Sequence, residues 1–116
     1  MTDEEVGVET ARRIAENESR FRDANEGIAD QADTLRVDGQ RPYLCECSDP
    51  RCVEIIVLDR GEYERVRSNP RWFAVARGHA INADGVGRAR EDHEHYTLVE
   101  KIDVAGEVAA ERDPRK

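Results

Sequence analysis

The first long pattern in the chain is helical. Between about Thr10 and Leu35, apolar side chains recur every seven residues and most of the positions between them are charged or polar. The apolar positions are Ile14, Phe21, Ile28 and Leu35, and no proline interrupts them. This spacing predicts one amphipathic helix with a narrow apolar stripe. We expect the stripe to pack on the rest of the chain, and a short coiled coil between two copies is the alternative.

Two features weaken this helix. The positions beside the stripe are filled by polar residues such as Glu18 and Asn25, which pack poorly in a coiled coil. Gly27 costs about 1 kcal/mol relative to alanine and could divide the helix in two. An isolated helix of this kind is marginal in water, so we expect it to be ordered only where it packs.

After residue 36 the pattern changes from helix to strand. Asp38-Gly39 predicts a turn. The β-branched run Val53–Leu58 predicts a largely buried strand, and Tyr43–Cys47 predicts a partner strand. Turn residues fill Ser48–Arg51, so the two strands together predict a hairpin with the cysteines at its tip.

A short helix and three further strands are expected downstream. Asp59 and Glu62 match a capping box, which predicts a helix that Asn69-Pro70 ends. Strands are expected over residues 72–76, 86–90 and 96–102, with a turn at 82–85. The last residues are rich in alanine and charge and predict a frayed tail or a short weak helix.

These elements predict an α+β fold. A long N-terminal helix precedes a small, mainly antiparallel β-sheet domain with one short helix. We expect a bound zinc ion to stabilise this domain. We divide the chain into an acidic helical arm (1–36), a cysteine-containing α+β domain (37–102) and a flexible or weakly helical tail (103–116).

Composition narrows the class of protein. Hydrophobic residues make up 38% and aromatic residues 5%, so the core is small and a metal or cross-link would help it fold. Most of the net charge of −8 lies in residues 1–40, which carry 11 acidic and 5 basic side chains. This balance disfavours a nucleic-acid binder, since such a protein needs a positive surface. We expect a cytoplasmic protein, because the chain has no apolar run of membrane-spanning length and its N-terminus is acidic.

All three cysteines lie within eight residues, at Cys45, Cys47 and Cys52. In a reducing compartment such a cluster indicates metal or redox chemistry rather than disulfides. Residues two apart on a strand point the same way, so two sulfurs can converge and the turn can return the third. Three thiolates suit tetrahedral Zn²⁺. We predict His79 as the fourth ligand because it follows Gly78 and the 72–76 strand, which we expect to pair beside the cysteine hairpin.

Other ligands and other chemistry stay open at this point. His93 and His95 compete with His79 for the fourth position, although acidic neighbours suggest a solvated turn. Free redox-active thiols, another metal and an iron–sulfur site are the alternatives to zinc. Glu46 should point away from the metal, while amides of the Ser48–Arg51 turn should donate to the sulfurs.

The segment from Pro42 to Lys101 also resembles a known group of proteins. The resemblance rests on the run Tyr43–Cys52, on Glu62–Arg67, and on Asn69-Pro70, Phe73–Val75, Gly78-His79 and Val99–Lys101. It is to small uncharacterised actinobacterial proteins with a Cys-x-Cys…Cys…Gly-His pattern. The resemblance implies that the three cysteines and His79 belong together, and it implies no activity.

These observations predict a small regulatory or protein-interaction module with a structural zinc site and no enzymatic activity. We expect the N-terminal helix to bind another protein. The alternatives are a thiol-based redox sensor and a nucleic-acid-binding regulator, which would use an arginine face made of Arg60, Arg65, Arg67, Arg71 and Arg77.

Overall fold

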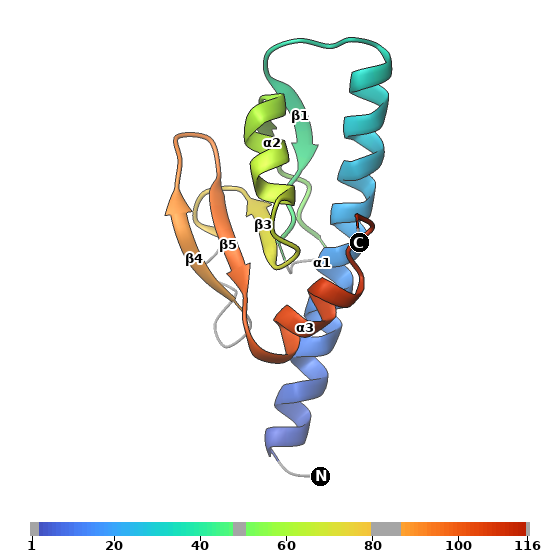
Figure 1. The fold of residues 1–116 in the computed structure, drawn as a ribbon. Coiled ribbons are helices and arrows are strands. Elements are labelled where there is room, and N and C mark those ends of the chain that lie inside the picture. The colour runs from blue at the N-terminus through green and yellow to red at the C-terminus, as the bar shows by residue number, and fades with distance from the viewer. Residues whose placement is uncertain (1–2, 48–50, 80–86, 116) are drawn as a thin grey trace.

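The structure, a computed structural model, describes residues 3–47, 51–79 and 87–115, with side chains from Thr10 onwards. One long helix runs along the molecule, and two small antiparallel sheets and two short helices pack beside it (Figure 1). The α+β fold class is therefore confirmed. The elements are α1 (Asp3–Thr34), β1 (Arg41–Leu44), β2 (Ile55–Leu58), α2 (Arg60–Arg67), β3 (Trp72–Val75), β4 (Gly87–Asp92), β5 (Thr97–Lys101) and α3 (Asp103–Glu111).

Helix α1 packs on its own chain, and Ile14 and Ile28 of the predicted stripe are partly buried against the core, but the fully buried positions lie beside the stripe. Leu35 is 64% exposed, and the other predicted stripe residues are only partly buried. Gly27 does not divide the helix. The buried face consists of small and polar residues, namely Ala15, Glu18, Ser19, Arg22, Asn25, Ala29 and Ala32.

The buried polar residues of α1 are held by partners from distant parts of the chain. Glu18 pairs with Lys101 of β5 in the core. Arg22 donates to the carbonyl oxygens of Pro70 and Ala109, at 2.7 and 2.8 Å. Asn25 binds both backbone groups of the last β1 residue. A buried polar group is tolerated when it is hydrogen-bonded, which explains why this face lies inward.

The predicted hairpin is present, but its second strand begins at Ile55, and Val53 and Ile55 are exposed, so the prediction of a largely buried strand over Val53–Leu58 is wrong. β1 and β2 pair antiparallel, with Tyr43 opposite Ile56. Asp59 caps α2 through the predicted capping box, since its side chain accepts from the Glu62 amide and Glu62 accepts from the Asp59 amide. The buried side of the hairpin meets the buried residues of α2, and the stacked rings of Tyr43 and Tyr63 lie 4.4 Å apart.

The second sheet has the strand order β3-β5-β4, all antiparallel. Its β3 strand lies beside the chain that leaves β1, because the Glu46 amide donates to the Ala74 carbonyl oxygen at 2.9 Å. The expectation that the 72–76 strand lies beside the cysteine hairpin is thereby confirmed. This contact brings the end of β3 to the cysteines.

The C-terminal segment is helical and packed. Ala105, Val108 and Ala109 of α3 are buried, and α3 lies against α1 (Figure 1). Within the described ranges, no helix is long and apolar enough to cross a membrane. The turn predicted at 82–85 and most of the turn predicted at 48–51 lie outside the described residues.

Candidate metal centre

The hairpin places two of the cysteines. Cys45 directly follows β1, and its amide donates to the Glu54 carbonyl oxygen at 3.1 Å, which extends the strand pairing by one step. Cys45 and Cys47 are both buried and lie two residues apart, on the side opposite Glu46. Cys52 lies three residues before β2 and is half-buried. All three thiols are free of disulfides.

A tight turn after β3 delivers His79. The His79 amide donates to the Ala76 carbonyl oxygen at 3.0 Å, so the chain reverses at once. Gly78 adopts a φ of 89°, a left-handed conformation that glycine reaches without the strain other residues incur. The turn directs the imidazole back towards the hairpin.

The four predicted residues form one group. One ligand atom from each of Cys45, Cys47, Cys52 and His79 lies within 4.8 Å of all the others. The Nδ1 atom of His79 is 3.3 Å from the Cys45 sulfur and 3.6 Å from the Cys52 sulfur. Zn–S bonds of about 2.3 Å and a Zn–N bond of about 2.0–2.1 Å give a sulfur–nitrogen edge of about 3.6 Å in a tetrahedron. The group could therefore hold a tetrahedral metal ion.

The surroundings of the group match those of a metal-bound thiolate. The Ala76 amide donates to the Cys45 sulfur at 3.1 Å, as amides do around ligating thiolates. Burial raises the pKa of the Cys45 thiol, and the Ala76 amide opposes this shift. A divalent cation in the centre would favour the thiolate and reverse the direction of that shift.

The competing histidines lie elsewhere. His93 bonds to Glu91 at 2.7 Å and stacks on Tyr96, while His95 is exposed. Neither belongs to the four-residue group that the described part of the chain forms.

Glu46 points into the core, away from the sulfurs. It is fully buried and accepts hydrogen bonds from Asn25, Arg67 and the Ala74 amide, at 2.9, 2.7 and 2.9 Å. These donors come from α1, α2 and β3. The residue between the two buried cysteines thus joins three elements. The sequence indicated only its direction, because its partners are distant in the chain.

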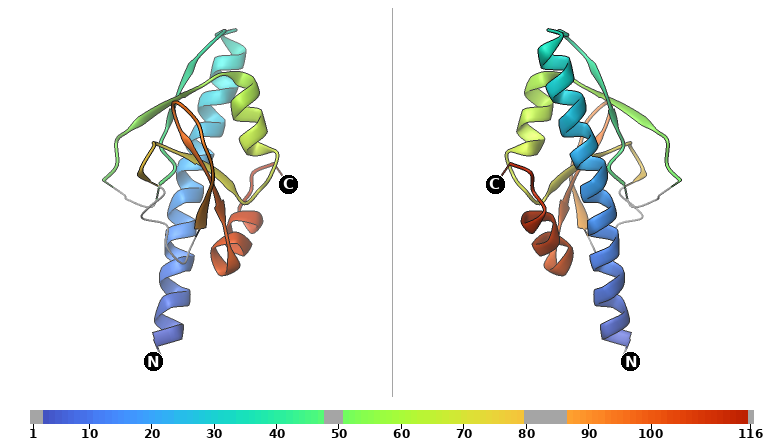
Figure 2. Two further views of the ribbon diagram at one scale, coloured as in Figure 1. Left: turned by 90° about the vertical axis from the view of Figure 1, so that its left-hand side faces the viewer. Right: turned by 90° about the vertical axis from the view of Figure 1, so that its right-hand side faces the viewer.

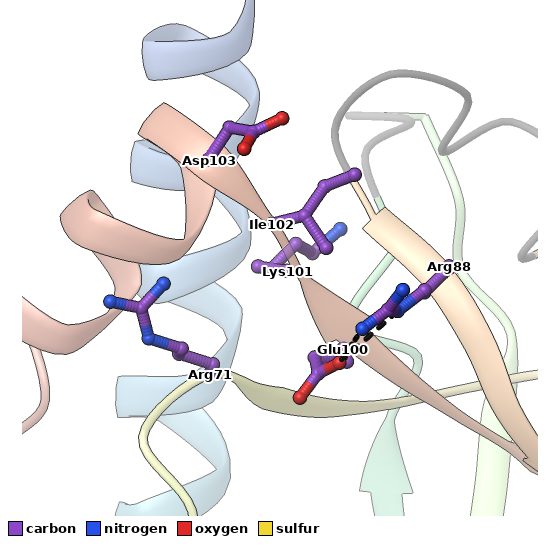
Figure 3. Close-up of a pocket in the computed structure, with 6 residues that line it drawn as sticks. All are labelled: Arg71, Arg88, Glu100, Lys101, Ile102 and Asp103. Atoms are coloured by element: carbon purple, nitrogen blue, oxygen red, sulfur yellow. Dashed lines mark hydrogen bonds and ion pairs between the residues drawn. The ribbon is translucent and has the colours of Figure 1, made fainter.

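A polar hollow of about 410 Å³ lies where β5 leads into α3 (Figure 3). Arg88 and Glu100 point towards each other there and are joined by hydrogen bonds of 3.0 and 3.2 Å, while Arg71 lies nearer to α3. The hydrogen bond from Arg88 lowers the pKa of Glu100. Lys101, on the same wall, uses its ammonium group in the core pair with Glu18. The charges of Arg88, Glu100 and Lys101 in this hollow are therefore paired with one another or with the core.

Comparison with protein-family models found no match, and comparisons with curated proteins and with solved structures found none either. The resemblance to the actinobacterial group stays a prediction. The candidate centre is therefore interpreted from its own geometry.

Proposed function

We propose that the four-residue group binds one Zn²⁺ ion and that the protein is a zinc-stabilised interaction module. The observation that carries the proposal is the convergence of three sulfurs and one imidazole nitrogen within 4.8 Å. Thiolate and imidazole are the ligands that zinc prefers, and this mixture is common in its structural sites.

Four protein ligands favour a structural role for the ion. Catalytic zinc sites usually keep one position for water or substrate, and a complete Cys₃His set leaves none. The free energy of metal binding then contributes to folding. This contribution suits a chain whose aromatic residues make up only 5% of the total.

The alternatives have weaker support. A redox sensor needs thiols that an oxidant can reach, and Cys45 and Cys47 are buried. A nucleic-acid binder needs free cationic side chains, but Arg67 is buried against Glu46 and Arg65 pairs with Glu91. An interaction role needs neither.

The proposal is tested by measuring the metal content of purified protein by mass spectrometry, and by competition with a chelator. We expect one zinc per chain in the wild type, and loss of tight zinc binding in Cys45→Ser, Cys47→Ser, Cys52→Ser and His79→Ala. His95→Ala removes an exposed histidine outside the group and is the matched control, so it should keep its zinc. A well-folded wild type without metal would refute the proposal. His79→Ala protein that binds zinc as tightly as the control would exclude His79 as a ligand.

A further inference from the structure

The large hydrophobic side chains that the described part of the chain exposes are Leu35, Val37, Val53 and Ile55, with exposed fractions of 64, 38, 87 and 55%. Three of the four are β-branched valine or isoleucine. Scattered exposed apolar residues are ordinary, but a contiguous group marks a binding surface. The four residues therefore indicate a binding surface only if they lie on one face of the molecule.

The strand register places them on one face. Leu35 and Val37 line a shallow apolar hollow of about 250 Å³ together with Pro42 of β1. Pro42 pairs with Val57, and residues directly opposite each other in a sheet share a face. Ile55 of β2 lies two residues from Val57 and shares its face, and Val53 lies two residues further back, just before β2 begins. We call this surface, made by Leu35, Val37, Pro42, Val53, Ile55 and Val57, the apolar face.

The apolar face ends at a strand edge whose backbone is available for pairing. β2 has β1 as its one neighbour in the sheet. Because the Cys45 amide bonds the Glu54 carbonyl, the backbone groups of Glu54, Ile56 and Leu58 face β1, and those of Val53, Ile55 and Val57 face away. In both views of Figure 2 the green strand that leads to α2 runs along the outer edge of the molecule.

The other strand edges are protected. Edge strand β4 carries charged residues, including Arg88, Arg90 and Glu91, and an irregularity in its pairing. The free side of β3 is covered by the segment around Glu46, and Asn25 binds the far side of β1. Proteins block edges in these ways to prevent unwanted pairing. In the described chain, β2 lacks charge, proline and cover on its outer side.

We infer that β2 is a self-association edge, on which a second copy of this chain adds its own β2 in antiparallel orientation. The outward-facing residues are symmetric about Ile55. A two-fold axis there places Ile55 opposite Ile55 of the second copy and Val53 opposite Val57, so that each facing pair exchanges backbone hydrogen bonds.

A second copy fits this edge because the edge is complementary to itself. Pairing aligns the two apolar faces on one side of a four-stranded sheet, where Ile55 contacts Ile55 of the second copy and Val53 contacts Val57 as cross-strand neighbours. A single two-stranded hairpin is marginal in water, and a wider sheet is more stable. The inference rests on the proposed interaction role and names the partner, whereas zinc content is measured separately.

The first test is the mass of the zinc-loaded full chain by sedimentation equilibrium over a range of concentrations. We expect the wild type to approach twice the chain mass as concentration rises, and Ile55→Lys to stay at one chain mass. Ala89→Lys adds the same charge to the exposed β4 edge and is the matched control, so it should behave as the wild type does. Unchanged zinc content and circular dichroism would show that Ile55→Lys still folds.

A second test addresses the register. Cysteine at position 55 would face itself across the two-fold axis, at a Cα separation of about 5.5 Å that suits a disulfide. With oxidised glutathione, Ile55→Cys should form an interchain disulfide while glutathione is reduced to two thiols, whereas Val53→Cys, which faces Val57, should cross-link at least tenfold less. A wild type that keeps one chain mass at every concentration, or an Ile55→Lys variant that still doubles, would overturn the inference. Zinc bound in either case would leave the metal proposal standing.

Discussion

Replacing Glu18 by glutamine should change how the stability of the protein depends on pH. Glu18 is 1% exposed, and one of its carboxylate oxygens contacts the Lys101 ammonium. The other oxygen is buried without a hydrogen-bond partner. Burial raises the pKa of Glu18 from 4.5 to about 7, against the attraction of Lys101 and with a small contribution from Glu46. The folded protein therefore favours the protonated carboxyl more than the unfolded chain does.

The size and sign of the effect follow from proton linkage. Between the two pKa values the folded chain binds more protons at Glu18 than the unfolded chain does. The contribution of Glu18 to the stability of the folded protein therefore falls as pH rises. The contribution is complete below pH 4.5 and is lost as pH rises through about 7, for a total of about 3 kcal/mol. Between about pH 5.5 and 8 it amounts to about 2 kcal/mol. Glutamine does not titrate, so Glu18→Gln should gain about 2 kcal/mol on the wild type over that range.

The measurement is urea unfolding of both proteins, saturated with zinc, at a series of pH values. The variant also loses its ion pair with Lys101, and the comparison of slopes over pH separates this loss from the titration of Glu18. Glu107→Gln, which changes an exposed carboxylate of α3, should run parallel to the wild type. The quantity to follow is the difference in the free energy of unfolding between Glu18→Gln and the wild type. If this difference stays constant with pH, or changes in the opposite direction, the attraction of Lys101 outweighs burial and our reasoning is wrong.

Two further predictions concern single elements of the fold. Gly106→Ala should lower the free energy of unfolding by about 1–3 kcal/mol, because its new Cβ would clash with the Arg71 guanidinium and would lie 2.9 Å from the carbonyl oxygen of Lys101 in β5. In Gly27→Ala the new Cβ meets nothing within 4 Å, so this change should raise the free energy of unfolding by up to about 1 kcal/mol. Thermal unfolding of both variants checks this, and midpoint shifts of the same sign in the two variants would contradict the prediction. Asp59→Ala should cost about 1 kcal/mol through loss of the α2 cap. Glu62→Gln, which can keep the capping box, should cost less in the same assay, and equal losses would argue against the cap.

The hairpin and the four-residue group could be predicted because their signals are local. The β-branched run of β2, the turn residues before it and the Asp59 capping box each carry their own signal. His79 is the predicted fourth ligand because a glycine and a strand precede it, and the structure brings it to the cysteines. The pairing of β3 with the segment after β1 has no local signal of its own, because Glu46 and Ala74 are distant in the sequence.

The buried face of α1 could not be predicted in this way. A hydrophobic pattern assigns charged residues to solvent, and it therefore selects the stripe that ends at Leu35. Glu18 and Arg22 face inward because of partners that no local pattern reveals. Arg22, for example, donates to a carbonyl oxygen 87 residues away. The packing of α3 had a weak signal in the spacing of Ala105, Val108 and Ala109, which is helical but lacks large side chains.

The side chains of Cys45, Glu46 and Cys47 point alternately to opposite sides of the strand. This alternation connects the candidate metal centre to the buried polar residues around Glu46. The outer two side chains direct sulfur to one side, and Glu46 directs its carboxylate to the other, where buried Arg67 donates to it. A slip of one residue would exchange the two sides. It would place sulfur against Arg67 and leave a buried guanidinium without its anion, at a cost of about 3–5 kcal/mol. The same slip would turn Glu46 towards the remaining ligands. The convergence of the sulfurs and the charge pairing of Glu46 therefore favour the same register, so a chain with few aromatic residues can define its fold at this point.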